Sequence, residues 1–428
     1  MTDTLRDPVR LIARGARQAA AGGGAPTAPD SRGLVYAAHK AVCDARGPFN
    51  ALGVSLFWLL WGLKHDHARA VQNLDACVGA DVIRILCCVG QPDDSWHDRI
   101  IDPRWPDFQA LLAEALELLQ ARGMRALVTI FGDATDAVPD EAARTAHVEQ
   151  VCEVLNAYPE AVYYVGISNE GIGFPDDGYA EILRHVARVQ DLTPFLCSSV
   201  CSLDEAPATV YAGRTERKVE GDGGMWEHTE QPYDLRETAL VAIDEEPIGP
   251  QSSVAEDDDP LRNTTHAACA WLMRAPLYVY HCGAGIRGGG QADLDRGRYA
   301  NLYDQPSFAP TLATLCQARD FLAGDLAQWS RISHSNPRYE GEFPFATAPL
   351  QPHDPAGWFL KAYANRSTDG RFACWFSKIE RDVPLVAIAP TTGDIADLRG
   401  GVRAFALAPG ETLTLTLRGA ALIRGTLA

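Results

Sequence analysis

The sequence has no apolar segment long enough to span a lipid bilayer. The apolar run 51–63 covers 13 residues, whereas a membrane helix needs about 20. The N-terminal segment also has no continuous apolar core of the kind found in secretory signal peptides. These absences predict a cytoplasmic or virion-associated protein with no transmembrane segment and no membrane partner.

Basic side chains are scarce relative to acidic ones. The chain carries 38 Lys and Arg against 56 Asp and Glu, a net charge of -18. Such a surface repels nucleic acid and anionic lipid but offers no barrier to a neutral sugar. The 11 cysteines are scattered, without the spacing of metal ligands, and Cys87 and Cys88 are adjacent. They predict buried, reduced thiols rather than a disulfide framework or a metal site.

Short apolar runs rich in β-formers alternate with amphipathic helical stretches, such as 105–121 and 145–155. This alternation predicts an α/β fold built from βα units. A doubly wound sheet usually has a Gly-rich turn after its first strand, and this sequence has none. Eight βα units instead predict a closed (β/α)₈ TIM barrel. The expected strands are Ala51 to Phe57, Val82 to Cys88, Ala126 to Phe131, Val162 to Ser168, Phe195 to Val200, Gly224 to His228, Ala239 to Asp244 and Leu277 to His281.

Composition divides the 428 residues into three parts. Residues 1–32 include a Gly-, Ala- and Pro-rich stretch and predict a mobile or docking tail. Residues 33–345 hold the barrel pattern. Residues 346–428 show period-two runs (RFACWFSK, VPLVAIAP and ETLTLTLRG) and predict a small antiparallel β-sandwich.

Acidic residues follow two of the expected strands. The fourth ends in Asn169-Glu170, and the seventh ends in Glu245-Glu246-Pro247. The carboxyl ends of barrel strands form the active-site face, and retaining glycoside hydrolysis needs two carboxyl groups about 5 to 5.5 Å apart. Because strand side chains alternate between faces, only one of Glu245 and Glu246 is expected to face the mouth.

These strand ends resemble clan A of the glycoside hydrolases, the cellulase-like retaining barrels. The resemblance implies an oligo- or polysaccharide substrate and no cofactor or metal. It makes Glu170 the acid/base and Glu246 the nucleophile, because the family's nucleophile usually ends its strand and Pro247 stops pairing there; Glu245 is the alternative. It also implies that Asn169 contacts the sugar 2-hydroxyl.

Further residues are expected around the substrate. Arg84, at the end of strand two, matches an Arg that supports the nucleophile in the family. The family's Trp after strand eight is replaced here by His281, which leaves the sugar class open. The remaining expected substrate-binding residues are Trp58, Trp226, His228 and Tyr233.

Two other functions fit the same pattern. A non-catalytic carbohydrate-binding or structural barrel, docked by its tail and β domain into a phage tail or other surface assembly, needs no active carboxylate pair. The second alternative is a barrel hydrolase or lyase that uses a metal.

Two further motifs do not indicate a binding site. The run Gly283 to Gly288 formally matches a dinucleotide fingerprint, but no amphipathic helix follows it, so it predicts a loop. His65 and His67 lack further ligands nearby and predict a surface role.

Overall fold

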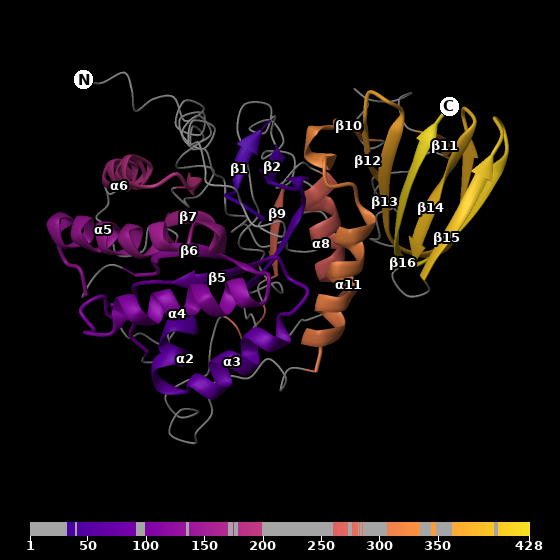
Figure 1. The fold of residues 1–428 in the computed structure, drawn as a ribbon. Coiled ribbons are helices and arrows are strands. Elements are labelled where there is room, and N and C mark those ends of the chain that lie inside the picture. The colour runs from indigo at the N-terminus through magenta and orange to yellow at the C-terminus, as the bar shows by residue number, and fades with distance from the viewer. Residues whose placement is uncertain are drawn as a thin grey trace.

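The computed structural model describes residues 32–38, 41–90, 99–133, 137–169, 174, 179–198, 260–272, 276–280, 282, 285, 306–333, 344–347, 362–397 and 401–428. Two bodies of regular structure make up this part of the chain (Figure 1). A parallel sheet with its helices comes first in sequence, and an antiparallel sheet follows it. All but the last residue of the predicted tail 1–32, and the expected strands at 224–228 and 239–244, lie outside the described residues.

The first body is a six-stranded sheet in the order β8-β7-β6-β5-β4-β9. Every neighbouring pair in it is parallel. Strand β9, expected as the eighth of the array, pairs with β4, expected as the first, and this is the adjacency that closure of a barrel requires. The strands are β4 (Ala51–Ser55), β5 (Val82–Leu86), β6 (Arg125–Phe131), β7 (Val162–Ser168), β8 (Cys197–Ser198) and β9 (Leu277–Tyr280).

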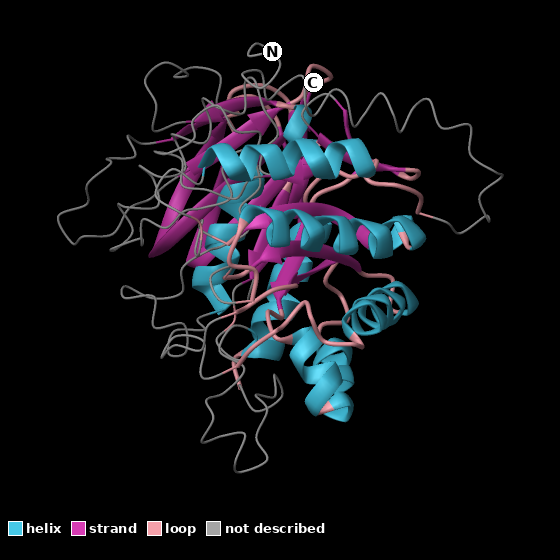
Figure 2. Cartoon of the chain, turned by 90° about the vertical axis from the view of Figure 1, so that its left-hand side faces the viewer, coloured by secondary structure: helices cyan, strands magenta, loops and turns pink. Residues whose placement is uncertain are grey.

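Helices connect and cover these strands, as Figure 2 shows. The expected helix 105–121 begins at Phe108, and the expected helix 145–155 is longer at both ends. Asp140 caps the latter, because its carboxylate accepts a hydrogen bond from Ala143 N at 2.8 Å. The helices are α2 (Leu59–His65), α3 (His67–Ala76), α4 (Phe108–Ala121), α5 (Glu141–Ala157), α6 (Tyr179–Leu192), α8 (Pro260–Leu272) and α11 (Phe308–Phe321), with short 3₁₀ turns η1 (Pro159–Ala161) and η3 (Leu326–Gln328).

Strands β4, β5, β6, β7 and β9 are buried on both faces, and the two faces belong to different clusters. Val82 and Leu127 pack in a small cluster with Val42 of an N-terminal hairpin. Their neighbours Ile83 and Val128 pack in the large cluster that contains the helices. Since successive strand side chains alternate, the large cluster marks the helix-covered face of the sheet, and the small cluster marks the opposite face, which we call the interior face.

The N-terminal hairpin lies at the amino ends of the strands. It consists of β1 (Tyr36–Ala38), β2 (Ala41–Asp44) and β3 (Gly47–Pro48) in one antiparallel sheet. Arg125, the first residue of β6, donates a hydrogen bond to Asp44 at 2.9 Å, and both side chains are buried. The carboxyl ends of the strands therefore lie at the opposite edge of the sheet.

The second body is a seven-stranded antiparallel sheet. Two runs expected as separate strands, RFACWFSK and VPLVAIAP, form one long strand with a register shift between Ser377 and Glu380. Phe345 is aligned with Ala387 at the end of this strand, and Phe372 lies near its start, yet the two rings lie 5.8 Å apart, so the sheet folds over itself around a shared core. The strands are β10 (Ser330–Ser333), β11 (Phe345–Thr347), β12 (Ala362–Arg366), β13 (Arg371–Ala387), β14 (Thr391–Asp397), β15 (Gly401–Leu407) and β16 (Thr412–Leu427).

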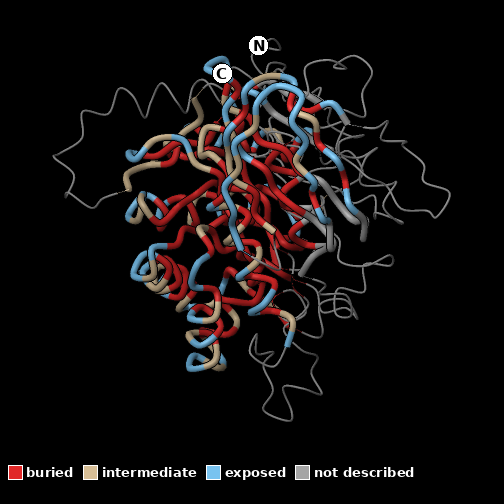
Figure 3. Tube along the Cα trace, turned by 90° about the vertical axis from the view of Figure 1, so that its right-hand side faces the viewer, coloured by how far each residue is buried: buried red, intermediate tan, exposed pale blue. Residues whose placement is uncertain are grey.

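The two bodies share one hydrophobic core. Trp375 and Leu422 of the antiparallel sheet belong to the same buried cluster as Trp271 of α8 and Leu315 of α11. The Arg424 guanidinium lies over the Phe321 ring, 4.7 Å from its centre. Figure 3 shows buried segments concentrated in the middle of the molecule. In the described ranges, no helix combines the length and apolar character needed to cross a membrane.

Candidate active site

Arg84 lies in the middle of β5 with its side chain on the interior face, two residues beyond Val82. It is fully buried. Its Nη2 donates a hydrogen bond to Asn169 Oδ1 at 2.8 Å, and its Nε donates one to Thr129 Oγ1 at 3.3 Å. The Phe57 ring packs under the guanidinium at 4.9 Å. A guanidinium held from three sides in this way has one orientation, as a positioning group requires.

Asn169 is the residue directly after β7. Its backbone N–H donates to Phe131 O at 2.7 Å, which fixes it to the end of β6. Because a guanidinium can only donate, the atom facing Arg84 is the amide oxygen, and the amide nitrogen is turned away from Arg84. Asn169 therefore directs its two N–H donors away from Arg84.

Buried polar side chains gather toward the carboxyl ends of the strands. Ser55 ends β4 and is aligned with Arg84, and Ser168 ends β7 and is aligned with Phe131. Ser55, Arg84, Thr129 and Ser168 are fully buried. Below them, the interior face is apolar. Such a change from apolar to polar lining along the strands is expected where a barrel opens to its active-site face.

Of the predicted site residues, the structure describes Arg84, Asn169 and Trp58. It brings the first two together. Trp58 is fully buried, and the Arg99 guanidinium lies over its ring at 5.1 Å, so Trp58 packs in the core and presents no face on which a sugar could stack. The predicted residues outside the described ranges are Glu170, Glu245, Glu246, Trp226, His228, Tyr233 and His281.

Sequence reasoning missed several polar residues at this edge. Asp133 follows β6 as Glu170 follows β7, and it is buried; the same strand-end rule would have found it. Thr129 was missed because it lies inside an apolar run, and Thr is common in β-strands without any functional role. The structure also pairs Asp133 with Val89 in an isolated β-bridge, which links the segments that follow β5 and β6.

A buried group of charged residues lies between α5 and α6. We call Arg144, Glu181 and His185 the α5–α6 charge cluster. Glu181 accepts hydrogen bonds from Arg144 and lies 3.1 Å from His185 Nε2. Burial raises the pKa of Glu181, but the hydrogen bonds from Arg144 and His185 outweigh it and lower that pKa. Burial also lowers the pKa of His185, against the opposing effect of Glu181.

Gly285, in the Gly-rich run after β9, contacts the residues at the end of β4 and just after it. Gly285 O accepts a hydrogen bond from Phe57 N at 3.0 Å. A Cβ at Gly285 would lie 1.9 Å from Ser55 O, so only glycine permits this approach. Close packing against β4 is therefore the reason for a glycine at position 285.

The two histidines that the sequence places at the surface lie on helices. His65 stacks on Trp61, with ring centres 4.6 Å apart, and His67 Nε2 lies 2.7 Å from Glu114 Oε1.

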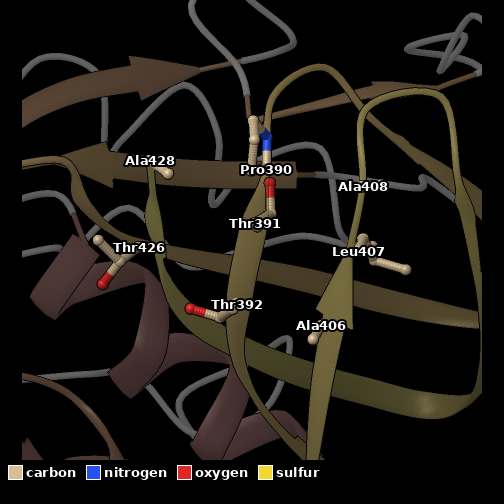
Figure 4. Close-up of a pocket in the computed structure, with 8 residues that line it drawn as sticks. All are labelled: Pro390, Thr391, Thr392, Ala406, Leu407, Ala408, Thr426 and Ala428. Carbon is tan, nitrogen blue, oxygen red and sulfur yellow. The ribbon is translucent and has the colours of Figure 1, made fainter.

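A depression of about 360 Å³ lies in the antiparallel sheet, between β14, β15 and the end of β16 (Figure 4). Its walls are mostly apolar, with Thr hydroxyls at one side, and it contains none of the predicted site residues. The residues that line it are Pro390, Thr391, Thr392, Ala406, Leu407, Ala408, Thr426 and Ala428.

No protein-family model matches the sequence, and a search of curated proteins gives no match either. Solved structures do match. A glycoside hydrolase family 5 protein from Bacteroides vulgatus has a TM-score of 0.64 and 12% identity over 92% of this chain and 94% of its own. A protein described as a glycoside hydrolase has a TM-score of 0.63 and 13% identity over 94% and 99%.

An α-amylase from Geobacillus thermoleovorans also matches, with a TM-score of 0.52 and 10% identity over 88% of this chain and 98% of its own. At such identities the likeness concerns the fold. The resemblance to barrel glycoside hydrolases, drawn from strand-end residues, is thus confirmed by structural neighbours. The chain is similar in fold to these solved glycoside hydrolases.

Proposed function

We propose that this chain is a glycoside hydrolase that cleaves O-glycosidic bonds of an oligo- or polysaccharide with retention of configuration. The observation that carries the proposal is the hydrogen bond between Arg84 and Asn169. It joins strands two and four at the edge where barrel active sites form, and Glu170 is the next residue of the chain. The fold shared with solved glycoside hydrolases supports the same conclusion.

In the proposed mechanism, Glu170 is the acid/base and Glu246 is the nucleophile, with Glu245 as the alternative. The Glu246 carboxylate attacks the anomeric carbon while Glu170 gives its proton to the departing glycosidic oxygen, and a glycosyl ester forms. Water then attacks the anomeric carbon, Glu170 takes its proton, and the ester bond breaks to release Glu246. Two inversions give net retention.

Arg84 and Asn169 serve this mechanism by binding and orientation. Arg84 fixes the amide of Asn169 so that its N–H groups donate to the sugar 2-hydroxyl, a contact that strengthens in the transition state. Arg84 also brings positive charge to the nucleophile, which keeps that carboxyl ionised. Trp226, His228, Tyr233 and His281 are proposed to complete the substrate site.

The architecture proposed for this function is a closed barrel in residues 33–345, with strands at 224–228 and 239–244 between β8 and β9. The pairing of β9 with β4 supports closure. Residues 1–32 are proposed as a tail and 346–428 as a β-sandwich. The folding of the antiparallel sheet around one core supports the sandwich. Strand β10 pairs with β12, so the sheet also takes in residues before 346.

The test is a panel of 4-nitrophenyl glycosides assayed with wild type, Glu170→Gln, Glu246→Gln and Glu245→Gln. Turnover by wild type, with a loss of about 100-fold or more in Glu170→Gln and Glu246→Gln, is expected. Glu141→Gln, on the exposed surface of α5, is the matched control and should match wild type. Proton NMR of the first product should show the anomer of the substrate.

Each other outcome has a definite meaning. Loss in Glu245→Gln with normal activity in Glu246→Gln would move the nucleophile to Glu245. Inversion at the anomeric carbon would contradict the double displacement. Equal turnover by all variants, or absence of turnover by wild type on every glycoside, would contradict the proposed function.

A further inference from the structure

The antiparallel sheet has one long edge strand, β15. It contains seven residues and pairs with β14 through seven consecutive residues without a register shift. In the described part of the chain, no strand pairs with its other side. Strands β10 and β11, which also lie at edges of this sheet, contain four and three residues. Sheet edges are usually protected by short strands, prolines, bulges or lysines, and β15, with the sequence GVRAFAL, has none of these.

The surface of β15 is mostly apolar and carries no acidic side chain. Val402 is 57% exposed, and Ala404 and Ala406 are exposed beside it on the same face of the strand. The other face carries Arg403, which is exposed, and Phe405, which is only partly buried against the core of the sheet. Because the chain has a net charge of -18, two copies repel each other in general. Strand β15 adds no negative charge, so two copies can meet there.

A second copy of the same strand fits this edge in one antiparallel register. When a twofold axis perpendicular to the sheet passes through Ala404, the middle residue, every residue of β15 has a partner in the other β15. Arg403 then lies opposite Phe405 of the second copy, where a guanidinium can rest on the aromatic ring. An axis through Arg403 would place two arginines opposite each other, which is unfavourable. An axis through Phe405 would leave Gly401 and Val402 without partners in the strand.

The register centred on Ala404 also covers the exposed apolar face. Val402 lies opposite Ala406 of the second copy, and the two side chains point to the same face of the sheet. Ala406 lines the depression shown in Figure 4, so Val402 of each copy packs at the rim of the depression in the other. Asp394 of β14, which is aligned with Ala404, is already paired with Arg424 at 3.3 Å. Its charge is therefore balanced within each copy.

We propose that β15 is a self-association surface through which two copies of this chain form a symmetric dimer. The antiparallel sheets of the two copies become one continuous sheet across the β15–β15 pair. The pairing uses the long edge of both copies and leaves the short edges β10 and β11, so assembly stops at two. The surface contains none of the candidate active-site residues, and the dimer does not depend on the proposed function.

Sedimentation velocity of the full chain measures the size of the assembly. Wild type at micromolar concentration is expected to sediment as a dimer of the 46.4 kDa chain. Ala404→Lys places two like charges at the axis and should weaken the dimer about 10-fold or more. Thr414→Lys, at an exposed position of β16 away from this edge, is the matched control and should leave the dimer unchanged. Circular dichroism checks that both variants are folded.

Engineered cysteines test the register. Ala404→Cys brings two thiols to the axis, on Cα atoms about 4.5 to 5.5 Å apart, within the range of a disulfide. Oxidised glutathione should therefore link this variant into a covalent dimer, beyond the level seen for wild type. Val402→Cys is the matched control, because the two copies of residue 402 are offset by about 13 Å along the strands and should not be linked. A mixture of Val402→Cys and Ala406→Cys should give the covalent dimer again.

Wild type that sediments as a monomer at every concentration would overturn this inference and leave the edge to a strand of a different protein. A dimer that Ala404→Lys does not weaken would overturn it too, because the contact would then lie elsewhere. Linking of Val402→Cys to itself, without linking of Ala404→Cys, would exclude the register. The cysteine variants also test the inference should Ala404→Lys fail to fold. Each of these outcomes leaves the proposed function intact.

Discussion

Arg84 and Asn169 are 85 residues apart in the chain, and their side chains meet at 2.8 Å between Nη2 and Oδ1. The contact lies between two strands that are not neighbours, since β6 separates β5 from β7. Thr129, on the strand between them, accepts from the Nε of the same guanidinium. One arginine thus ties three strands together at the edge where the candidate active site lies.

Replacing Arg84 should lower activity more than replacing an arginine that only stabilises the fold. Arg84→Lys removes the planar pair of donors that reaches Asn169 and Thr129 together, so we expect kcat/KM on the best 4-nitrophenyl glycoside to fall about 100-fold. Arg125, equally buried at the amino end of β6, provides the control. Arg125→Met leaves Asp44 without this partner and should lower the free energy of unfolding by about 3 to 5 kcal/mol.

Replacing Arg84 should therefore lower activity, whereas replacing Arg125 should lower stability. Arg125→Met should keep kcat/KM of the folded fraction within about twofold of wild type. Activity assays and urea denaturation of the same preparations measure both quantities. Normal activity in Arg84→Lys would remove Arg84 from the proposed site.

Breaking the α5–α6 charge cluster should destabilise the fold. Glu181→Gln leaves the buried Arg144 guanidinium without a counter-charge, so we expect the free energy of unfolding to fall by about 3 to 5 kcal/mol. Glu141→Gln removes a partner of the exposed Arg184 and should leave that free energy unchanged. Urea denaturation followed by circular dichroism measures both. A small, equal effect in the two variants would mean that Arg144 and Glu181 remain hydrated.

His147 should make stability depend on pH. It packs between the rings of Phe108 and Phe131, at 5.3 and 5.5 Å. Burial lowers its pKa from 6.5 to about 4. As pH falls, the unfolded chain therefore takes up a proton at this residue before the folded protein does. The contribution of neutral His147 is complete above its unfolded pKa and is lost progressively as pH falls toward 4.

His147→Leu isolates this effect, because leucine does not titrate. Between about pH 7.5 and pH 4.5, wild type should lose about 2 to 3 kcal/mol of unfolding free energy relative to the variant. Urea denaturation at several pH values in this window gives the difference directly. A constant difference across the window would show that His147 takes up its proton equally in the folded and unfolded states.

Much of the parallel sheet could be predicted from the sequence, because its strands are buried on both faces and appear as continuous apolar runs. Strand β7 has the predicted bounds, Val162–Ser168. Strand β4 ends at Ser55 rather than Phe57, since the chain turns there into α2. Strands β14 and β15 were not predicted. The first contains Thr, Gly and Asp, so it shows no apolar pattern. The second, GVRAFAL, has apolar residues but is mostly exposed, so the pattern of a buried strand does not apply to it.

The candidate site was predictable only in part. Asn169 stood out because it directly follows an apolar strand, where the active sites of barrels form. Arg84 stood out through the family resemblance, which expects an Arg at the end of strand two, although the structure places Arg84 in the middle of β5. Their direct contact was not foreseen. Arg144 and Glu181 are on different helices, 37 residues apart, and only the packing of α5 against α6 makes them a pair. In sequence they are two ordinary charges on amphipathic helices.

The pairing of β4 with β9 can be tested at Gly53 and Val279, which are aligned in adjacent strands. A Cβ at Gly53 would lie 2.9 Å from Val279 Cγ2. Gly53→Ala should therefore lower the free energy of unfolding by about 1 to 3 kcal/mol through overpacking. Val279→Ala should lower it by about 2 kcal/mol through loss of buried methyl groups.

In the double variant, the new methyl group at position 53 occupies the space that Val279 leaves. Its cost should therefore fall short of the sum of the single costs by about 1 kcal/mol or more, well beyond the roughly 0.5 kcal/mol scatter of independent sites. Urea denaturation of the four proteins gives this coupling energy. Additive costs would mean that the two residues do not touch, and β9 would then lose its place beside β4. Strong coupling would support the contact between the first and last strands on which the proposed barrel depends.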